Sequence, residues 1–534
     1  MAFRFLARNQ PAARLLSPER LGGLRVAALS ASAGRSAAAH REVMKFGGAS
    51  LGSADAVHRV AMLVAAKASG AAAAGSGDEI GVVLSAMYGV AEALAEASTA
   101  ARTRNFVLLR KLRNQIVAGH LETIDALFAP PAMGATRVHA QGESPNAALD
   151  LQSPAARMGR TELDALRTTL RSEVEQLMER DFDTPVGALF KESFETPGDA
   201  PAVKAQLDRM QSLGERLSCL IFEKYLIAMG TSAVLADPTG LIRTNGKYGA
   251  ALPDLEASAA LIQAQLDSVL AAGSVAVVPG LYGGAVDNPA AITTFNRGGS
   301  DLTATLLGRG LGADEVSLWR VEPVQEAESG AFVDWAPGSV GVVHDGDAKT
   351  TIPVLTYNEA EVLTRYGKEI VDPQIVSPIE AKEIPIRIRN TLEPAREGTT
   401  IVAADDKPAA AAAATTVVRV RNRGALDASA AAALPPSREV IAVVGDDIRA
   451  SLQDAQTDVA DLVASVDSRL GDGAELSAEW TLDASPHAIP LTVEASKAND
   501  AIAALTATLA GVNTGALTSI NVTPEPLTAS QPTL

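Results

Sequence analysis

A lysine followed by a glycine pair, close to the start of the chain, is the first group of residues that could do chemistry. The segment EVMKFGGAS, residues 42–50, predicts a short buried strand that contains Lys45 and ends in Gly47 and Gly48. Burying a lysine among apolar side chains is costly unless it meets an anion, and glycines let the backbone approach an anion closely. We therefore expect Lys45 to meet a phosphate, with Gly47, Gly48 and Ser50 as candidate phosphate- or nucleotide-binding residues.

A second glycine-rich turn lies in the segment ITTFNRGGSDLTATLLGRGLGAD, residues 292–314. Arg297 precedes the turn, and Asp301 opens the helix that follows it. The residues of the turn itself are Gly298, Gly299 and Ser300. Free backbone N–H groups and the positive end of a helix dipole attract anions, so the turn is a second candidate phosphate site. Asp301 can cap the helix, and its carboxylate can also orient a lysine or a metal ion beside the anion.

The two turns together predict a phosphoryl-transfer site without a P-loop, because this chemistry needs positioning and positive charge rather than covalent help. Lys45 would neutralise charge on the transferred phosphoryl group, and Mg²⁺ would bridge the phosphates of a nucleotide. Asp301 would orient Lys45. A carboxylate acceptor needs no general base, since its pKa of about 4 leaves it ionised at pH 7. Arg297 could bind a second carboxylate of the acceptor with its planar guanidinium, and Glu215 could hold an ammonium group.

The elements that must position these residues alternate between strands and helices. Buried strands are predicted at residues 80–85, 233–235, 275–278 and 316–319, and helices at 54–68, 255–270 and 302–311. Such alternation predicts an α/β fold whose mostly parallel sheet is covered on both faces. Ligands of such sheets bind at the carboxyl ends of the strands, where Lys45 and Ser85 lie. Helical spacing of apolar residues in 106–127 and 161–178 predicts a helical insertion or lid.

Composition excludes several classes of function. The chain has 534 residues, enough for two or three domains. A net charge of −17 argues against nonspecific nucleic-acid binding, which needs a basic face. The single cysteine, Cys219, excludes an intramolecular disulfide and a cysteine-based zinc site. The six histidines show no ligand spacing, so we assign no metal-ligating residue. No uncharged apolar run of the length of a membrane span occurs, so we expect no membrane partner.

The two ends of the chain differ from its middle. Residues 1–40 are rich in arginine and nearly free of acids, which is typical of an organelle transit peptide. The alternative is a disordered tail, in which case the protein would be cytoplasmic. This composition does not distinguish a plastid-targeting peptide from a mitochondrial one. Residues 524–534 are expected to be a disordered tail.

The region after residue 400 predicts a second type of domain. Residues 401–437, with two alanine runs, are expected to be a linker with a degenerate segment that contains a short strand at 417–420. Within residues 438–523 strands are predicted at 439–444, 475–482, 489–493 and 518–522, and helices at 451–466 and 496–509. This βαββαβ order is that of a ferredoxin-like domain. Because it contains no catalytic cluster, we expect it to regulate or to dimerise.

Five ordered blocks together resemble the aspartate kinases of the amino-acid-kinase family. They are MKFGGAS, VLSAMYGV, GERLS, PGLYGG with residues 292–314 after it, and YGKEIVDPQIVSPIEAKEIPIRIRNTLEP. The match covers roughly residues 43–401, so the catalytic domain is placed at 41–400. The resemblance implies a three-layer α/β/α fold followed by ACT-like regulatory domains. It also implies a homodimer or higher oligomer and an amino-acid effector such as lysine or threonine.

The same resemblance implies a reaction and a set of roles. The reaction would be the transfer of a phosphoryl group from ATP, with Mg²⁺, to L-aspartate. The product, 4-phospho-L-aspartate, enters lysine, threonine and methionine synthesis. The family motif places the phosphate-binding lysine at Lys45 and the catalytic aspartate at Asp301. It places the substrate contacts at Ser85, Glu215 and Arg297.

The sequence departs from the family pattern mainly in its nucleotide-binding half. Ala49 and Ala91 replace threonines, and Asn296 replaces a glycine. Residues 320–324 read RVEPV where the family has a segment like TDVDG. Farther on, Glu369 replaces a lysine and Asp372 a histidine, with Lys368 as a neighbouring cation.

Three functions therefore stay open from the sequence. The first is an active aspartate kinase with a modified nucleotide pocket. The second is a catalytically impaired paralogue that binds an amino acid and pairs with an active subunit. The third is another amino-acid-kinase member that acts on glutamate or a nucleotide, against which the GERLS block and the ACT-like region argue.

Overall fold

The computed structural model describes most of the chain in two compact units, residues 1–314 and 315–534, here called the N-terminal and C-terminal units. The described residues are 40–70, 77–129, 154–191, 200–296, 298–321, 342–345, 348–351, 353–365, 371–407, 415–420, 438–444, 459–470, 488–511 and 517–522. The predicted transit peptide and C-terminal tail lie outside the described residues, apart from His40.

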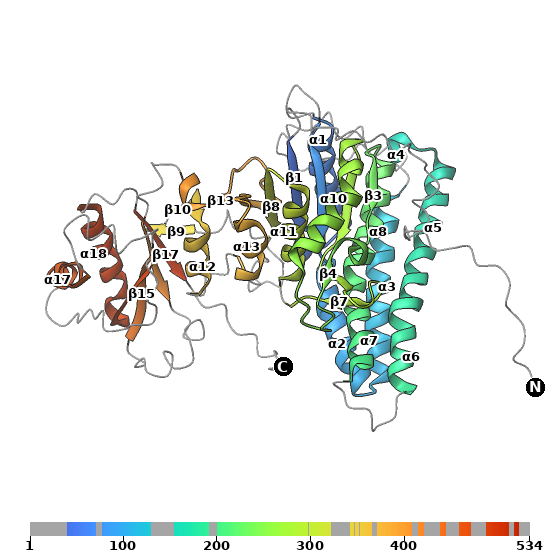
Figure 1. Ribbon diagram of the computed structural model, residues 1–534, viewed down its shortest axis with the longest axis horizontal. Coiled ribbons are helices and arrows are strands. Elements are labelled where there is room, and N and C mark those ends of the chain that lie inside the picture. Colours follow the sequence, from blue (N-terminus) through green and yellow to red (C-terminus); the bar gives the residue numbers. More distant parts are fainter. Residues whose placement is uncertain are drawn as a thin grey trace, which may run out of the picture. The chain divides into compact units, whose positions relative to one another are not determined.

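A parallel sheet forms the centre of the N-terminal unit (Figure 1). Its strands run in the order β1-β2-β5-β3. Their bounds are Arg41–Phe46 for β1, Glu79–Leu84 for β2, Val275–Pro279 for β5 and Ala233–Leu235 for β3. Nearly every residue of β1, β2 and β5 is buried, as expected for strands covered on both faces. The predicted parallel sheet and its strand positions are thus confirmed.

Helices cover both faces of this sheet. Helices α1 (Ala54–Ala68) and α8 (Leu213–Ala228) pack together against it, and α10 (Leu255–Ala271) and α11 (Gly299–Leu311) form a second pair. Ser53 caps α1 by accepting the Ala56 N–H, and Asp254 caps α10 by accepting the Ala257 N–H. The result is the expected α/β/α sandwich.

The predicted helical insertion is present as a run of helices between β2 and α8. It comprises α2 (Val90–Arg102), α3 (Phe106–Leu127), α4 (Pro154–Arg157), α5 (Arg160–Met178), a π-helical turn (Glu179–Asp183), α6 (Thr184–Lys191) and α7 (Pro201–Gln211). Asp181 in the π-helical turn is fully buried and pairs with three arginines. They are Arg180 at 2.7 Å, Arg209 at 2.6 Å and Arg216 at 2.9 Å.

A small sheet of three short strands, which the sequence did not predict, lies in the segment before α11. Its order is β4-β6-β7, with bounds Arg243–Thr244, Tyr282–Ala285 and Ile292–Thr294. The short helix α9 (Pro238–Leu241) precedes it. These three segments, RT, YGGA and ITT, lack the apolar run that made the equally short β3 recognisable. Strand β7 leads directly into the glycine-rich turn before α11.

The C-terminal unit begins with strands that run in the order β11-β13-β12-β8. Their bounds are Val354–Thr356, Thr399–Val402, Ile386–Asn390 and Glu315–Arg320, and a hairpin of β9 (Val342–Asp345) and β10 (Ala348–Thr351) lies between β8 and β11 in the chain. Two helices belong to this part, α12 (Tyr357–Arg365) and α13 (Pro373–Glu380). The buried Lys407 pairs with Glu359 at 2.8 Å, which fixes the chain after β13 to α12.

A second sheet of the C-terminal unit has the order β16-β15-β14-β17. Its strands are Ala488–Glu494, Arg438–Val444, Thr415–Val420 and Leu517–Val522, and its helices are α17 (Val459–Leu470) and α18 (Ala498–Gly511). Strand β14 confirms the strand predicted at 417–420 and begins two residues earlier. It pairs with both β15 and β17, because its β-branched TTVVRV sequence suits a sheet. The strand predicted at 475–482 lies outside the described residues.

Among the described residues, no helix combines the length and the apolar character that crossing a membrane requires.

Candidate active site

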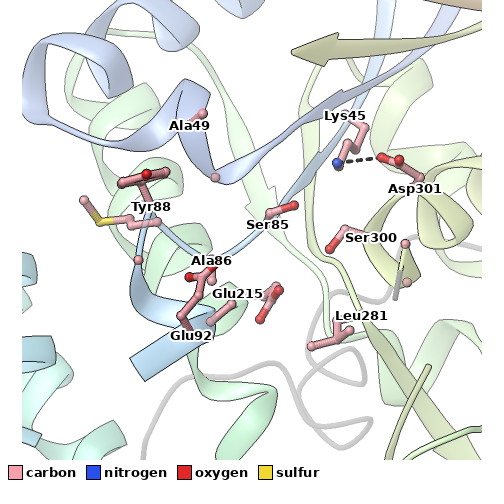
Figure 2. A pocket seen from close by; sticks show the side chains of 16 residues that line it. Lys45, Ala49, Ser85, Ala86, Tyr88, Glu92, Glu215, Leu281, Ser300 and Asp301 are labelled. Carbon is pink, nitrogen blue, oxygen red and sulfur yellow. Dashed lines mark ion pairs between the residues drawn. The ribbon is translucent and has the colours of Figure 1, made fainter. Parts of the chain in front are cut away.

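A cavity of about 370 Å³ in the N-terminal unit brings most of the candidate residues together (Figure 2). Eight of the residues singled out from the sequence line it: Lys45, Gly48, Ser85, Glu215, Gly298, Gly299, Ser300 and Asp301. They come from the ends of β1 and β2 and from the first turns of α8 and α11. Residues more than 250 positions apart in the sequence thus line the same cavity, as a phosphoryl-transfer site built from both glycine-rich turns requires.

The centre of the site is an ion pair between Lys45 and Asp301. The Lys45 Nζ lies 2.6 Å from Asp301 Oδ1, and the two side chains point toward one another in Figure 2. Lys45 is only 8 % exposed, so its charge is largely withdrawn from solvent. Asp301 does not cap α11, which is a correction, because the capping position is taken by Gly298 with φ of +81° and no side-chain bond. The Asp301 carboxylate instead pairs with the lysine and can orient it.

The strand ends bring Lys45 close to Ser85. Parallel pairing sets Lys45 opposite Val83 and Phe46 opposite Leu84, and the Ser85 N–H donates to the Phe46 carbonyl at 3.1 Å. Gly48 follows at the same edge, where a Cβ atom would lie 2.8 Å from the carbonyl oxygen of Ala86. Only glycine fits this close approach of the two strand ends.

Two of the predicted phosphate-binding residues do not line the cavity. Gly47 precedes a short 3₁₀ helix, Gly48–Leu51, and Ser50 is buried within it at 1 % exposure. The turn of that helix directs Ser50 toward the protein interior. Arg297, the predicted acceptor contact, lies outside the described residues.

Glu215 enters the cavity from the first turn of α8 and is only 4 % exposed. Burial raises the pKa of this carboxyl to about 8, although the N–H groups of Glu215 and Ala86 and the charge of Lys45 act in the opposite direction. Within the described chain, its Oε2 atom has no hydrogen-bond partner. A buried carboxyl with an unused oxygen is suited to bind a cationic group of a ligand.

Helix α8 is fastened to the edge of the sheet beside this carboxyl. The Ser218 hydroxyl lies 2.7 Å from the Ser85 carbonyl oxygen and 3.0 Å from the Glu215 carbonyl oxygen. Cys219, the next residue, is fully buried, and burial together with the charge of Glu215 raises the pKa of its thiol well above the ordinary value. The thiol is therefore an inert part of the packing and not a nucleophile.

The structure adds cavity residues that the sequence did not single out. Leu281 lines the cavity with φ of +81°, a conformation that costs a residue with a side chain about 1–3 kcal/mol. The Thr303 hydroxyl oxygen accepts the Leu281 N–H at 3.1 Å and helps to hold this conformation. Leu281 lies in the PGLYGG block, but its strained backbone has no sequence signal. Tyr88 also lines the cavity and is 57 % exposed.

The departures from the family pattern fall at this cavity and beyond it. Ala49 and Ala91 both line it, so neither position offers a hydroxyl to a ligand. Asp372 caps α13, where its side chain accepts the Gln374 N–H at 2.9 Å. Arg320 ends β8, whereas residues 322–324 and 366–370, including Lys368 and Glu369, lie outside the described residues.

Comparison with known proteins agrees with this geometry. The sequence profile of the amino acid kinase family matches residues 40–321, more than half of the chain. Aspartokinase 1, chloroplastic, of Arabidopsis thaliana is 32 % identical over 198 residues, which cover 36 % of this chain and 32 % of that protein. Lysine-sensitive aspartokinase 3 of Escherichia coli is 29 % identical over 241 residues, 45 % of this chain and 48 % of that protein. The matched segments therefore span only about a third to a half of these relatives.

Solved structures show the same fold over a larger part of the chain. E. coli aspartokinase III in complex with lysine and aspartate superimposes with a TM-score of 0.62 at 20 % identity, covering 88 % of this chain and 99 % of that one. The same enzyme in complex with aspartate and ADP gives a TM-score of 0.56 at 21 % identity, covering 88 % of this chain and 100 % of that one. At this identity the likeness establishes the fold.

Proposed function

Because the chain belongs to the amino acid kinase family, we propose that it is an aspartate kinase. In this reaction ATP phosphorylates the side-chain carboxylate of L-aspartate to 4-phospho-L-aspartate, the first step toward lysine, threonine and methionine. The observation that carries the proposal is the Lys45–Asp301 ion pair, 2.6 Å long, in a glycine-lined cavity that also holds the buried Glu215. The relatives named as aspartokinases support the choice of substrate.

The phosphoryl-transfer half of the site uses Lys45 and the glycine turn. Lys45, held by Asp301, would neutralise the charge that develops on the transferred group. The N-terminus of α11 at Gly298 and Gly299 would direct backbone N–H groups at its oxygens. The acceptor carboxylate attacks phosphorus while the bond to the ADP leaving oxygen breaks, and ADP takes the electron pair of that bond. No proton moves, because the attacking carboxylate is already ionised.

The acceptor half uses the groups that can recognise an amino acid. The unused Oε2 of Glu215 would bind the ammonium group of aspartate. Arg297 would bind its α-carboxylate, and Ser85 would complete the contacts. Since the ammonium group favours an ionised partner, Glu215 would lose its proton as aspartate binds.

Mg²⁺ belongs to the nucleotide in this proposal. Among the described residues, no group of three or more histidine, cysteine, aspartate or glutamate side chains is arranged to hold a metal ion. The cavity nevertheless has carboxylates at Asp301 and Glu92. One or two carboxylates fit a magnesium ion that keeps its remaining ligands from phosphate and water oxygens. When bound, the ion would supply positive charge between the phosphates.

The finer assignments follow from the relatives and belong to the same proposal. Lysine is the first effector to test, since it is bound in one of the matching structures, and threonine is the second. The segment 438–523 would be an ACT-like regulatory domain, and the protein a homodimer or a higher oligomer. Because three of the matched relatives are chloroplastic, residues 1–40 would direct the protein to a plastid.

The test is an assay that traps aspartyl phosphate as its hydroxamate, with ATP, Mg²⁺ and L-aspartate. The full-length protein should form the hydroxamate, and Lys45→Ala should lower kcat by a factor of about 10²–10³ or more, since the developing charge loses its partner. Lys111→Ala, which changes an exposed lysine of α3, is the matched control and should leave the rate unchanged. Absence of hydroxamate from folded protein would refute the kinase proposal.

One observation favours a second candidate function. The side chain of Asp372 is used as a helix cap at a position where the family pattern has a histidine, and Ala49 and Ala91 lack hydroxyls at the cavity. A paralogue with impaired catalysis, which binds an amino acid and pairs with an active subunit, would tolerate such losses. Titration with ATP by calorimetry separates the two, because micromolar binding of ATP argues for the enzyme and against the impaired paralogue.

A further inference from the structure

Asp208 is a buried carboxylate of α7 that joins two separate backbone segments. It is 2 % exposed. Its Oδ2 atom accepts the N–H of Gly249 at 2.9 Å and the N–H of Thr294 at 2.7 Å. The two N–H donors are 45 residues apart in the sequence, and neither belongs to the helix that carries Asp208. A single carboxylate oxygen therefore sets the distance between both segments and α7.

The first of these segments is the loop of residues 245–251, and the second is β7. The Asn245 side chain accepts the N–H groups of Lys247 and Leu252, so the loop is ordered from within. The Ala251 N–H donates to the Thr294 carbonyl at 2.9 Å. Both backbone polar groups of Thr294 are thus bonded, one to Asp208 and one to the loop. Thr294 is itself buried at 1 % exposure, so water cannot replace Asp208 there without opening the structure.

A continuous series of contacts connects Thr294 with the cavity. The next residue, Phe295, donates its N–H to the Leu281 carbonyl at 2.8 Å. Gly299 lies so close to both that a Cβ atom there would be 2.9 Å from Phe295 Cβ and 3.0 Å from Leu281 Cδ1. Leu281 and Gly299 both line the cavity. A shift of the end of β7 would therefore be transmitted to the glycine turn, because tightly packed groups move together.

We propose that Asp208 is a positioning residue for the acceptor side of the active site. It fixes the end of β7 and, through Phe295, the positions of Leu281 and Gly299 in the cavity lining. In the proposed function the chain that follows β7 also supplies Arg297 to the acceptor. This inference rests on the proposed function, since the acceptor side is defined by aspartate. Asp208 does not line the cavity and acts through Thr294 and Phe295.

The positioning role of Asp208 depends on its Oδ2 atom as a hydrogen-bond acceptor and not on its negative charge. Burial raises the pKa of Asp208 to about 6, and the bonds from Thr294 and Gly249 lower it in part. An asparagine at this position offers an amide oxygen with the same two lone pairs at the same distance from the backbone. Asp208→Asn should therefore preserve the arrangement, whereas Asp208→Ala removes the acceptor of both N–H groups.

The experiment measures KM and kcat of the full-length protein and of both variants by the hydroxamate assay. For Asp208→Ala we expect the KM for aspartate to rise about tenfold or more and the KM for ATP to change by less than about threefold, since misplacement of a binding group weakens the substrate it contacts. In Asp208→Asn the KM for aspartate and the KM for ATP should each stay within about twofold of the values of the unchanged protein. If Asp208→Ala does not fold, Asp208→Glu, which displaces the oxygen by one methylene, replaces it with the same expectation.

A second readout does not depend on turnover. Amide hydrogen exchange in residues 245–251 and 292–300 should become faster in Asp208→Ala and remain slow in Asp208→Asn, while the rest of the sheet is unchanged. The matched control is Asp164→Ala, which removes a half-exposed carboxylate of α5 that pairs with Arg167 of the same helix, and should change neither readout.

Three results overturn the positioning role. They are equal impairment in Asp208→Ala and Asp208→Asn, an unchanged KM for aspartate in Asp208→Ala, and unchanged exchange in both segments. A protein that forms no hydroxamate at all refutes the kinase proposal instead. In that case the exchange experiment still decides whether Asp208 holds the two segments.

Discussion

Asp181 and Glu215 are both buried carboxyl groups of the N-terminal unit, but the chain surrounds them differently. Asp181 is fully buried, and three arginines reach it within 2.9 Å. Burial alone would raise its pKa, yet the charge of Arg216, the bond and charge of Arg180 and the bond from Arg209 hold the pKa below the ordinary value. No described residue forms a hydrogen bond with Glu215 Oε2, and burial raises the pKa of this carboxyl to about 8. The protein itself completes the first group, whereas in the proposed function the ammonium group of a ligand completes the second.

This difference separates structural from functional burial of charge. A buried carboxylate that meets several cations fixes the elements that carry them, here the π-helical turn, α7 and α8. A buried carboxyl without such partners costs stability, and groups of this kind concentrate at binding and catalytic sites. Three changes test whether the two groups really differ in this way.

The largest expected effect is the loss of stability in Asp181→Ala. The free energy of unfolding should fall by about 3–5 kcal/mol, because Arg216, itself buried, is left as an uncompensated charge. Urea denaturation followed by circular dichroism measures this loss. Asp164→Ala, at an exposed ion pair, should lose no more than about 1 kcal/mol. A loss in Asp181→Ala as small as that of the control would show that the arginine cluster is dispensable.

The next effect is on substrate binding in Glu215→Gln. The KM for aspartate should rise about 10–150-fold, which corresponds to the roughly 1.5–3 kcal/mol of a hydrogen bond to a charged group. Stability should stay the same or increase, since a buried acid without a partner is replaced by a neutral amide. Steady-state kinetics and urea denaturation of the same preparations test both statements. A clear loss of stability with an unchanged KM would make Glu215 a structural residue like Asp181.

The smallest expected change is that of aspartate binding over a single pH unit. Below pH 8 the free protein carries a proton on Glu215, which must leave before the ammonium group can bind an ionised carboxylate. The KM for aspartate should therefore fall by up to about tenfold, or roughly 1.4 kcal/mol, for each pH unit between 6 and 8, and level off above pH 8. Glu215→Gln should remove this slope. A slope that persists in the variant would assign the titration to another group.

Much of the site could be predicted from the sequence because its main residues violate local expectations. A lysine within an apolar strand and a glycine pair after it have a clear physical reason only beside an anion. The carboxyl ends of parallel strands must meet at one edge, so Lys45 and Ser85 were expected to be neighbours, and the pairing of β1 with β2 confirms this. The same logic recovered the strands and helices of the sandwich, whose apolar periods are long enough to be distinctive.

The missed features depend on contacts between distant segments. No local sequence pattern indicates that Asp208 accepts hydrogen bonds from Gly249 and Thr294. The same holds for the strained backbone of Leu281, which also follows from packing. Asp301 was expected to be able to cap its helix, but the ion pair with Lys45 uses its carboxylate. A strand at 417–420 was expected between two alanine runs, but its pairing with β15 and β17 is a contact between distant segments that the local sequence does not record.

The burial of Cys219 gives the protein an intrinsic probe of its own motions. It is the one thiol in 534 residues, and it is fully buried directly after Ser218, which fastens α8 to the strand end. A thiol-labelling reagent can therefore react only when α8 separates from the sheet, and the labelling rate counts these openings. A ligand that binds Glu215 must slow that rate. Occupancy of the site could thus be followed by mass spectrometry, one label per molecule, without measuring any turnover.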